Sequence, residues 1–283
     1  MDAYQDFAYV YDELMDNTPY EEWCERIETL IAKYGVSEPV DRECVEVPEE
    51  CDLAEGEEND EQCILDSEKN LVVDLGCGTG TLTELLYQKG YDMIGIDNAE
   101  EMLNIAMEKR AESGSQILYL LQDMRELELY STVGTVISVC DSVNYILEDE
   151  ELLETFSLVN NYLYPGGIFI FDFNTEYKYR EIIGDSTIAE NREDCSFIWE
   201  NYYDEESAIN EYEVTIFVKE EDDLFRKFTE THFQKGYTAK KIAKLIERAG
   251  MELVVMKDAD TDGDITDESE RIYVVAKEVK KKV

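Results

Sequence analysis

The chain of 283 residues is poor in residue types on which several common chemistries depend. It has one histidine, His232, and none of its seven cysteines is part of a CxxC pair. A histidine-rich metal centre is therefore excluded, the usual ligand spacing of a zinc site is missing, and a hydrolytic triad would have to use His232. The odd number of scattered cysteines and the absence of a signal-like start indicate a reducing compartment, so we expect a cytoplasmic protein.

Basic residues are also scarce. There are 25 Lys and Arg against 68 Asp and Glu, a net charge of −43. Such a charge repels phosphates and anionic headgroups, so we expect neither nucleic-acid nor membrane binding. No apolar run reaches the roughly 18 residues of a membrane-spanning helix. With 44% hydrophobic and 11% aromatic residues, the chain can still build a folded core.

The acidic residues are concentrated in three segments. Residues 36–70 hold fourteen acids and two bases, residues 200–223 hold ten and one, and residues 258–270 hold seven and none. Residues 224–257 and 271–283 are basic on balance. Charge blocks of this kind are usually solvated loops and faces.

The hydrophobic pattern alternates between short apolar runs and amphipathic helical segments, which is typical of an α/β fold with a parallel, doubly wound sheet. We expect a Rossmann-like, seven-stranded, mostly parallel sheet with helices on both faces. Three segments that alternate apolar and polar residues, at 197–203, 208–219 and 225–234, predict a small inserted antiparallel β sub-domain.

This reading divides the chain into four parts. They are an N-terminal helical cap (1–35), an acidic loop insertion (36–70) for which disorder is the alternative to an ordered loop, a Rossmann-like core (71–173 and 237–279), and an antiparallel β insert (174–236).

A glycine turn carries the strongest chemical signal. The apolar strand Leu71–Leu75 leads into Gly76-x-Gly78-x-Gly80 and then into a helix, which lets backbone approach a ligand closely. The dinucleotide fingerprint GxGxxG would place its third glycine at Thr81, so the spacing fits a pyrophosphate poorly.

Two acids accompany this turn. Asp74 lies directly before it, where it suits a cationic or zwitterionic ligand, and Asp97 ends the second strand, where an acid accepts ribose hydroxyls in this fold. Alternatively, both carboxylates merely cap helices.

The segment Asp258–Ser269 follows a calcium-loop pattern at Asp258, Asp260 and Asp262. Ser269 occupies the position of the bidentate Glu, and strands rather than helices are expected on both sides. We therefore interpret it as a solvated hairpin loop and expect no metal.

The glycine segment Val72–Gly80 resembles motif I of class I S-adenosylmethionine-dependent methyltransferases. Three further segments resemble the family's adenine-contacting segment, its methyl-facing motif and its turn into strand five; these are Leu121–Leu127, Ser138–Tyr145 and Leu163–Phe169. Tyr4–Met15 and His232–Tyr237 are similar to a bacterial subgroup of uncharacterised methyltransferases, from whose pattern residues 36–70 depart.

The resemblance implies S-adenosylmethionine as the cofactor. Asp74 would take its ammonium, Asp97 its ribose and Asp123 its adenine amino group. The implied cofactor-binding residues are Tyr4, Tyr11, Asp74, Gly76, Cys77, Gly78, Gly80, Asp97, Asn98, Met102, Asp123, Met124, Asp141 and Ser142.

The resemblance also implies an acceptor site under the antiparallel β insert at 174–236, and this pocket is less well defined than the cofactor site. Its candidate residues are Asn144, Tyr145, Phe173, Asn174, Trp199, His232, Gln234 and Tyr237. A general base, where one is needed, would be Asp141, His232 or a tyrosine. Asp141 is alternatively a plain loop acid, His232 a half-buried strand residue, and Trp199 a packing residue.

We expect transfer of a methyl group to a small molecule, by a monomer or homodimer. The alternatives are a methyltransferase that acts on RNA or protein, and a regulatory module that binds the cofactor without catalysis. A nucleotide-sugar or NAD enzyme is disfavoured by the loop spacing.

Overall fold

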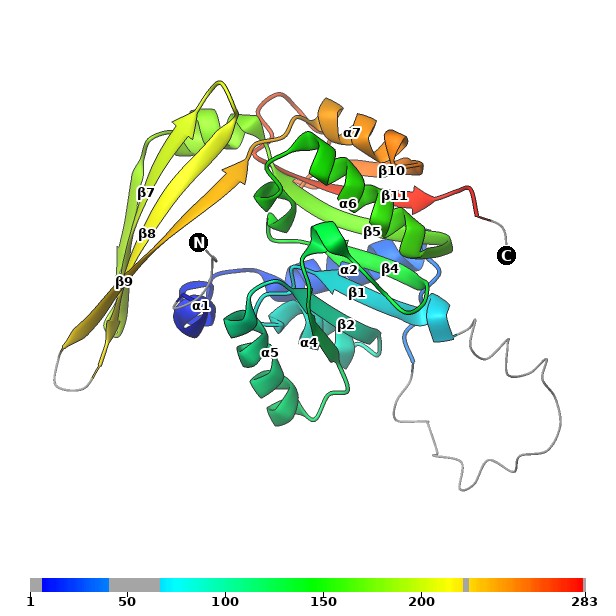
Figure 1. Ribbon diagram of the computed structural model, residues 1–283, viewed down its shortest axis with the longest axis horizontal. Coiled ribbons are helices and arrows are strands. Elements are labelled where there is room, and N and C mark those ends of the chain that lie inside the picture. Colours follow the sequence, from blue (N-terminus) through cyan, green and yellow to red (C-terminus); the bar gives the residue numbers. More distant parts are fainter. Residues whose placement is uncertain (1–6, 41–66, 221–223, 282–283) are drawn as a thin grey trace.

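The computed structural model describes residues 7–40, 67–220 and 224–281, and two β-sheets form its frame (Figure 1). The α-helices are α1 (Ala8–Leu14), α2 (Tyr20–Tyr34), α4 (Thr81–Gln88), α5 (Glu100–Ser113), α6 (Asp149–Tyr162) and α7 (Ala239–Arg248). The strands of the larger sheet are β1 (Leu71–Leu75), β2 (Asp92–Asp97), β3 (Leu118–Leu121), β4 (Val133–Ser138), β5 (Leu163–Asn174), β10 (Met251–Asp258) and β11 (Arg271–Glu278).

The larger sheet has the order β10-β11-β5-β4-β1-β2-β3. Neighbours from β5 to β3 are parallel, and β11 is antiparallel to both β5 and β10. The expected seven-stranded, mostly parallel sheet is thereby confirmed. The strand order reverses beside β1, and in open α/β sheets a crevice forms outside the carboxyl ends of the strands at such a point.

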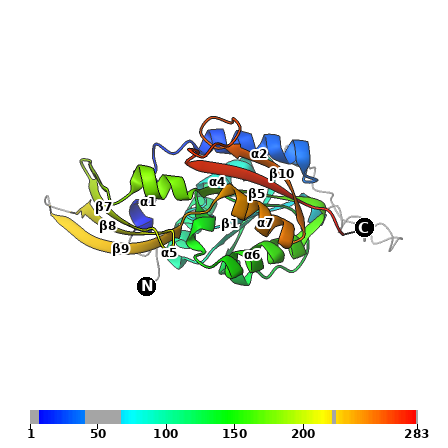
Figure 2. The same cartoon turned by 90° about the horizontal axis from the view of Figure 1, so that it is seen from above.

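Two apolar layers cover the two faces of this sheet. Alternate residues of β5 point to opposite sides: Ile168 and Ile170 pack with α2 and α4, whereas Phe169, Phe171 and Phe173 pack with α6 and α7. Figure 2 shows α2 and α6 on opposite sides of the sheet. Because the strands are covered on both faces, they are continuously apolar, as parallel strands usually are.

The smaller sheet extends away from the core (Figure 1). Its antiparallel strands run in the order β6 (Thr187–Asn191), β7 (Cys195–Asp204), β8 (Ile209–Lys219) and β9 (Phe225–Lys235). The sequence predicted β7, β8 and β9 but missed β6, since all five residues of β6 are exposed and show no alternation.

Helix α1 lies against the inner face of the smaller sheet. Val10, with Phe7 and Leu14 beside it, packs in one apolar cluster with Tyr212, Val214 and other inward-facing strand residues. Part of this sheet therefore uses its apolar face to hold the N-terminal helix.

The two ends of the predicted acidic loop lie side by side. Ser37 Oγ donates a hydrogen bond to the Lys69 carbonyl at 3.0 Å, and Glu38 N donates to Asn70 Oδ1 at 3.0 Å. The chain thus leaves the core and re-enters it at one place. Residues 41–66, including Cys44, Cys51 and Cys63, lie outside the described residues.

Candidate active site

The glycine turn follows β1 and leads into α4. Gly76, Gly78 and Gly80 have φ values of 76°, 54° and 74°, a left-handed conformation that glycine adopts without strain. A Cβ on Gly76 would lie 2.6 Å from Ser142 Oγ, whereas one on Gly78 would meet no atom within 4 Å. The turn needs glycine for its conformation, and at Gly78 it leaves open space.

That space belongs to a cavity of about 370 Å³ at the carboxyl ends of the parallel strands. Eleven of the fourteen predicted cofactor residues line it; these are Tyr11, Asp74, Gly76, Cys77, Gly78, Asp97, Asn98, Met102, Asp123, Met124 and Ser142. Gly80 and Asp141 are not among the lining residues, and Tyr4 lies outside the part of the chain that the structure describes. A Cβ on Gly80 would meet the Tyr119 hydroxyl at 2.5 Å, so this glycine serves close packing of the turn.

Asp74 is the most buried carboxylate of the cavity, with 2% of its surface exposed. Its Oδ2 accepts a hydrogen bond from Thr83 Oγ1 at 2.7 Å. Burial raises the pKa of Asp74 to about 7, although the Thr83 bond acts in the opposite direction. A cation beside this carboxylate would restore its charged form.

Asp97 ends β2 and organises two neighbouring segments. Its Oδ2 accepts from Gly78 N at 2.8 Å, and its Oδ1 accepts from Ala99 N at 2.9 Å. Loss of hydration raises the pKa of Asp97, and the hydrogen bonds from the backbone oppose that rise. This carboxylate therefore links the glycine turn to the start of α5.

Asp123 lies at the predicted adenine end and is held by Arg125. The Arg125 guanidinium donates to both carboxylate oxygens, from Nε at 3.0 and 3.1 Å and from Nη2 at 2.6 Å. Hydrogen bonding by Arg125 lowers the pKa of Asp123. The sequence did not single out Arg125, which also lines the cavity.

Helix α1 is tied to the glycine turn by Asp12. Its carboxylate accepts from Thr79 Oγ1 at 2.6 Å and from Thr81 Oγ1 at 3.3 Å, and it pairs with Lys109 Nζ at 2.6 Å. This anchoring brings Tyr11, on the same helix, to the wall of the cavity.

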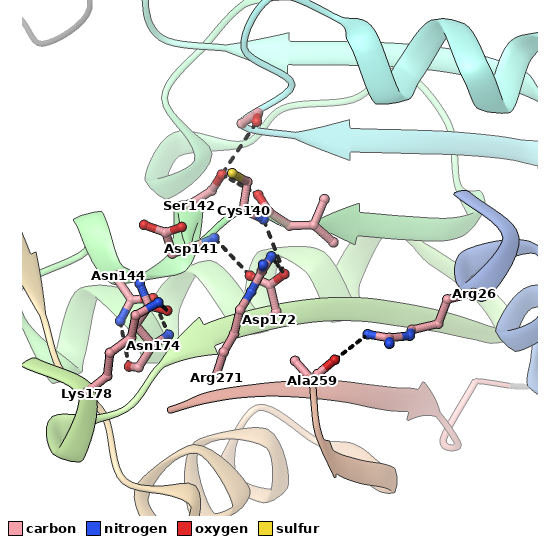
Figure 3. A network of polar contacts seen from close by, with 12 residues as sticks. Arg26, Cys140, Asp141, Ser142, Asn144, Asp172, Asn174, Lys178, Ala259 and Arg271 are labelled. Atoms are coloured by element: carbon pink, nitrogen blue, oxygen red, sulfur yellow. Dashed lines mark hydrogen bonds and ion pairs between the residues drawn. The ribbon is translucent and has the colours of Figure 1, made fainter. Parts of the chain in front are cut away.

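The turn that follows β4 has an uncommon backbone conformation and is fixed by hydrogen bonds to Asp172. Cys140 and Asp141 have φ values of 61° and 53°, which is uncommon for residues with a side chain. Their backbone N–H groups donate to Asp172 Oδ2 and Oδ1 at 3.2 and 2.8 Å, and Arg271 pairs with the same carboxylate (Figure 3). The guanidinium carbon of Arg271 lies 4.3 Å from the ring centroid of Trp23.

Several predicted acceptor residues form a buried polar network instead of lining the cavity. Asn144 Nδ2 donates to the Asn174 carbonyl on β5 (Figure 3). It also donates to the Lys235 carbonyl, which joins the segment after β4 to β9. Gln234 donates to Asp141 and accepts from the Tyr179 hydroxyl. These groups are paired with protein partners.

Phe173 and Tyr237 are fully buried in the main core. The Tyr237 hydroxyl donates to the Ile146 carbonyl. Trp199 lies in the apolar cluster of the smaller sheet, 5.1 Å from the ring of Tyr212. Of the eight predicted acceptor residues, Tyr145 lines the cavity.

His232 lies behind Tyr145, with 1% of its surface exposed. The Tyr145 hydroxyl is 3.2 Å from His232 Nδ1 and 2.7 Å from the Tyr212 hydroxyl. The sequence missed Tyr212, although it faces His232 directly across the β8–β9 pair. Three further lining residues, Tyr20, Cys140 and Ile146, were not named as site residues, although Cys140 lies within the motif-like segment Ser138–Tyr145.

The loop between β10 and β11 is a hairpin connection, as the sequence predicted. Asp258 Oδ1 accepts from Asp260 N, Thr261 N and Thr261 Oγ1, so it closes the turn by itself. Within residues 7–40, 67–220 and 224–281, no three potential metal ligands come together. No helix in these ranges is both long and apolar enough to span a bilayer.

Comparison with known proteins agrees with this geometry. A family described as a methyltransferase domain matches residues 72–167. A Bacillus subtilis protein named "Putative methyltransferase YqeM" is 32% identical over 278 residues, which cover 98% of each chain. The crystal structure of an S-adenosylmethionine-dependent methyltransferase from Clostridium acetobutylicum is 25% identical, with a TM-score of 0.76 over 98% of this chain and 100% of that one.

A shorter match covers part of the core. A dTDP-3-amino-3,4,6-trideoxy-alpha-D-glucopyranose N,N-dimethyltransferase of Streptomyces venezuelae is 29% identical over 103 residues, 36% of this chain and 42% of that one.

Because the Bacillus relative matches nearly the whole chain, this protein belongs to the class I S-adenosylmethionine-dependent methyltransferases. It is an enzyme, and its methyl donor is S-adenosylmethionine. The cavity fits that cofactor, since it combines open space at Gly78 with a buried carboxylate suited to an ammonium group and a second carboxylate at the end of β2.

Proposed function

We propose that this methyltransferase acts on a small molecule and methylates a nitrogen or oxygen that enters the cavity beside Tyr145. In the proposed arrangement Asp74 binds the cofactor ammonium, Asp97 the ribose and Asp123, shared with Arg125, the adenine amino group. Asn98 and Met102 flank the adenine, and Ser142 borders the methyl end.

The observation that carries this proposal is the presence of three tyrosines in the wall of the cavity. Tyr11, Tyr20 and Tyr145 line it together with Cys140 and Ile146, and α1 is fixed across the glycine turn through Asp12. A concave cavity of about 370 Å³ with tyrosines in its wall suits a compact acceptor better than an RNA or protein surface.

The net charge of the chain and one sequence relative also support a small-molecule acceptor. The net charge of −43 opposes binding of RNA, and the Streptomyces venezuelae relative carries a sugar amine in its name. The cofactor supplies a methyl group already activated by its sulfonium. The protein therefore has to align the acceptor, exclude water and remove a proton where the acceptor carries one.

A transfer screen tests this proposal. The purified protein is given S-adenosylmethionine and separate panels of small amines, phenols, hydroxy compounds and carboxylates, with total RNA and a peptide mixture as further arms. Formation of S-adenosylhomocysteine is measured.

We expect turnover with at least one small amine or hydroxy compound, and its loss in Asp97→Ala. Asp92→Ala is the matched control, because Asp92 is the exposed acid at the other end of the same strand. Transfer only to RNA or peptide would contradict a small acceptor. Binding of S-adenosylhomocysteine without transfer to any panel would favour a regulatory module.

A further inference from the structure

We propose that a second cavity, next to the one at the glycine turn, is a binding site for a small monocarboxylate, which Arg26 and Arg271 recognise. This site is separate from that of S-adenosylmethionine, and the inference does not depend on the identity of the methyl acceptor.

The second cavity has a volume of about 310 Å³ and is lined by residues of α2, β5 and β11. Trp23 and Arg26 of α2 and Arg271 and Tyr273 of β11 contribute to its wall. Val139, directly after β4, lines this cavity and also the cavity at the glycine turn. The two cavities are therefore neighbours at the end of β4, and the volume of the second falls in the range of small-molecule sites.

Both arginines of the second cavity stack on aromatic rings of its wall. The guanidinium carbon of Arg271 lies 4.3 Å from the Trp23 ring centroid, and that of Arg26 lies 5.0 Å from the Tyr273 ring centroid. An aromatic face fixes a guanidinium plane and leaves the N–H groups at its edge able to donate. The two cations thus have defined orientations before a ligand arrives.

These guanidiniums have more hydrogen-bond donors than protein partners. Across residues 7–40, 67–220 and 224–281, Arg26 donates from Nη1 to the Ala259 carbonyl at 3.1 Å, and Arg271 donates from Nη2 to Asp172 (Figure 3). Each guanidinium carries five N–H donors. Arg271 Nε is even buried without a partner in the described part of the chain, which is rare for a buried polar group. The protein therefore leaves hydrogen-bonding capacity unused at both cations.

The acids of the second cavity do not cancel both positive charges in its interior. Asp172 is the buried one, and it accepts from two backbone N–H groups of the turn after β4 as well as from Arg271. Glu22 and Asp260 also line the cavity but are exposed to solvent. One buried carboxylate thus accompanies two guanidiniums, an excess of one positive charge in a chain of net charge −43.

A monocarboxylate matches this charge and shape. Its two oxygens accept parallel N–H bonds from a guanidinium, and its single charge balances the excess. A phosphate dianion is disfavoured, because the exposed acids and the net charge of the chain repel it. Ile27, Leu30 and Ile170 make part of the wall apolar, so we expect the body of the ligand to be small and apolar.

The alternative is that the two arginines only fasten α2 and β11 to their neighbours. Trp23 distinguishes the two cases, because the chain has two tryptophans and the second, Trp199, lies in the apolar cluster of the smaller sheet. Protein labelled with ¹⁵N-tryptophan therefore gives two indole signals, which Trp199→Phe assigns.

The experiment adds benzoate to this protein with S-adenosylhomocysteine present in excess. Benzamide, the uncharged analogue of benzoate, and inorganic phosphate are titrated separately. We expect benzoate to shift the Trp23 signal saturably and to leave the Trp199 signal in place, and both other compounds to bind about tenfold more weakly or less. Absence of a saturable Trp23 shift with benzoate, or equal binding of benzamide or phosphate, would overturn the proposal.

Arg26→Gln is the variant that tests the recognition, since loss of Arg271 would also break its pair with Asp172. Lys33→Gln is the matched control, because Lys33 is an exposed cation of the same helix that does not line the second cavity. Benzoate affinity should fall about tenfold or more in Arg26→Gln and stay within about twofold in Lys33→Gln. Equal affinities in the two variants would overturn the proposal.

Thermal unfolding shows whether both variants are folded. The comparison of benzoate with benzamide uses the wild-type protein, so it decides the question even where Arg26→Gln does not fold. Failure of the transfer screen would count against the proposed function, whereas the Trp23 signal reports on the second cavity independently of any methyl transfer.

Discussion

At the scale of single residues, the site depends on carboxylates kept in unlike environments. Asp74 is buried beside Thr83 and has a pKa of about 7, whereas the Arg125 guanidinium lowers the pKa of Asp123. Near neutral pH, Asp74 is therefore only partly ionised before a ligand binds, and Asp123 is fully ionised. A zwitterionic ligand that brings an ammonium to Asp74 has to remove its proton first.

This difference predicts the pH dependence of cofactor binding. Because binding requires the ionised form, affinity for S-adenosylhomocysteine should fall about tenfold per unit as the pH drops below about 7, and level off above it. Calorimetry in two buffers of unlike ionisation enthalpy should show about one proton released per ligand below that pH. Asp74→Asn should remove this dependence.

The raised pKa of Asp74 also makes the stability of the folded protein depend on pH. The pKa of Asp74 in the folded protein lies above the ordinary aspartate value of 3.8, so between the two values the folded protein without cofactor keeps a proton that the unfolded chain has lost. Asp74 therefore makes the free protein less stable as the pH rises from 3.8 to about 7. A pH dependence of affinity that survives in Asp74→Asn would assign the linkage to another group.

At the scale of elements, the turn between β4 and η2 is maintained by β5 and β11. Asp172 on β5 accepts from two consecutive N–H groups of that turn. Arg271 on the neighbouring strand β11 forms an ion pair with Asp172, although the strand register places Arg271 opposite Asn174. Left-handed residues with side chains persist only where surrounding groups hold them. The ion pair therefore supports the position of Ser142 and Tyr145 without lining the cavity at the glycine turn.

Breaking this pair should be costly. Asp172→Asn leaves the Arg271 guanidinium, 17% exposed, without its counter-charge, and we expect a loss of about 3–5 kcal/mol in the free energy of unfolding. Chemical denaturation measures it. Asp264→Asn removes a carboxylate that is 96% exposed and pairs with Lys257, and should change stability by less than about 0.5 kcal/mol. Equal effects of the two substitutions would refute the supporting role of Asp172.

The elements also show how far local pattern reaches. The buried strands and amphipathic helices of the core were predictable because apolar residues recur along each of them with the spacing of that element. The glycine turn was predictable because it needs φ values that glycine favours. Strand β6 was not predictable, since it is exposed along its whole length. The role of α1 was also hidden, because its apolar side packs on strands about 200 residues away in sequence.

At the scale of the whole molecule, most of the residues predicted to bind the cofactor line one cavity, whereas most of those predicted to bind the acceptor do not. Asp74, Gly78 and Asp97 lie at the ends of consecutive core elements, so their spacing along the chain fixes their proximity in space. Several residues that the sequence predicted for the acceptor lie instead in contacts between the smaller sheet and the core. Phe173 and Tyr237 are buried in the main core and do not line the cavity. The contact between Tyr145 and Tyr212 joins segments far apart in the sequence, so the local pattern does not predict it.

Charge belongs to this scale as well. Of the 68 acidic residues, the few carboxylates of the cavity are buried or paired, and the acidic blocks lie in loops, in the smaller sheet and in residues 41–66, which lie outside the described ranges. The net charge of −43 is therefore mainly a property of the surface, where it repels anionic partners. The proposed chemistry depends on the few carboxylates that line the cavity.

The most direct test of this account is calorimetry with S-adenosylhomocysteine on wild type, Asp97→Ala and Asp92→Ala. The account predicts one binding site in wild type, an affinity unchanged in Asp92→Ala, and an affinity about tenfold to a hundredfold weaker in Asp97→Ala, as expected for lost hydrogen bonds to a charged group. Thermal unfolding of the three proteins shows that they are folded. Absence of binding in wild type, or equal affinity in wild type and Asp97→Ala, would contradict the assignment of the cavity.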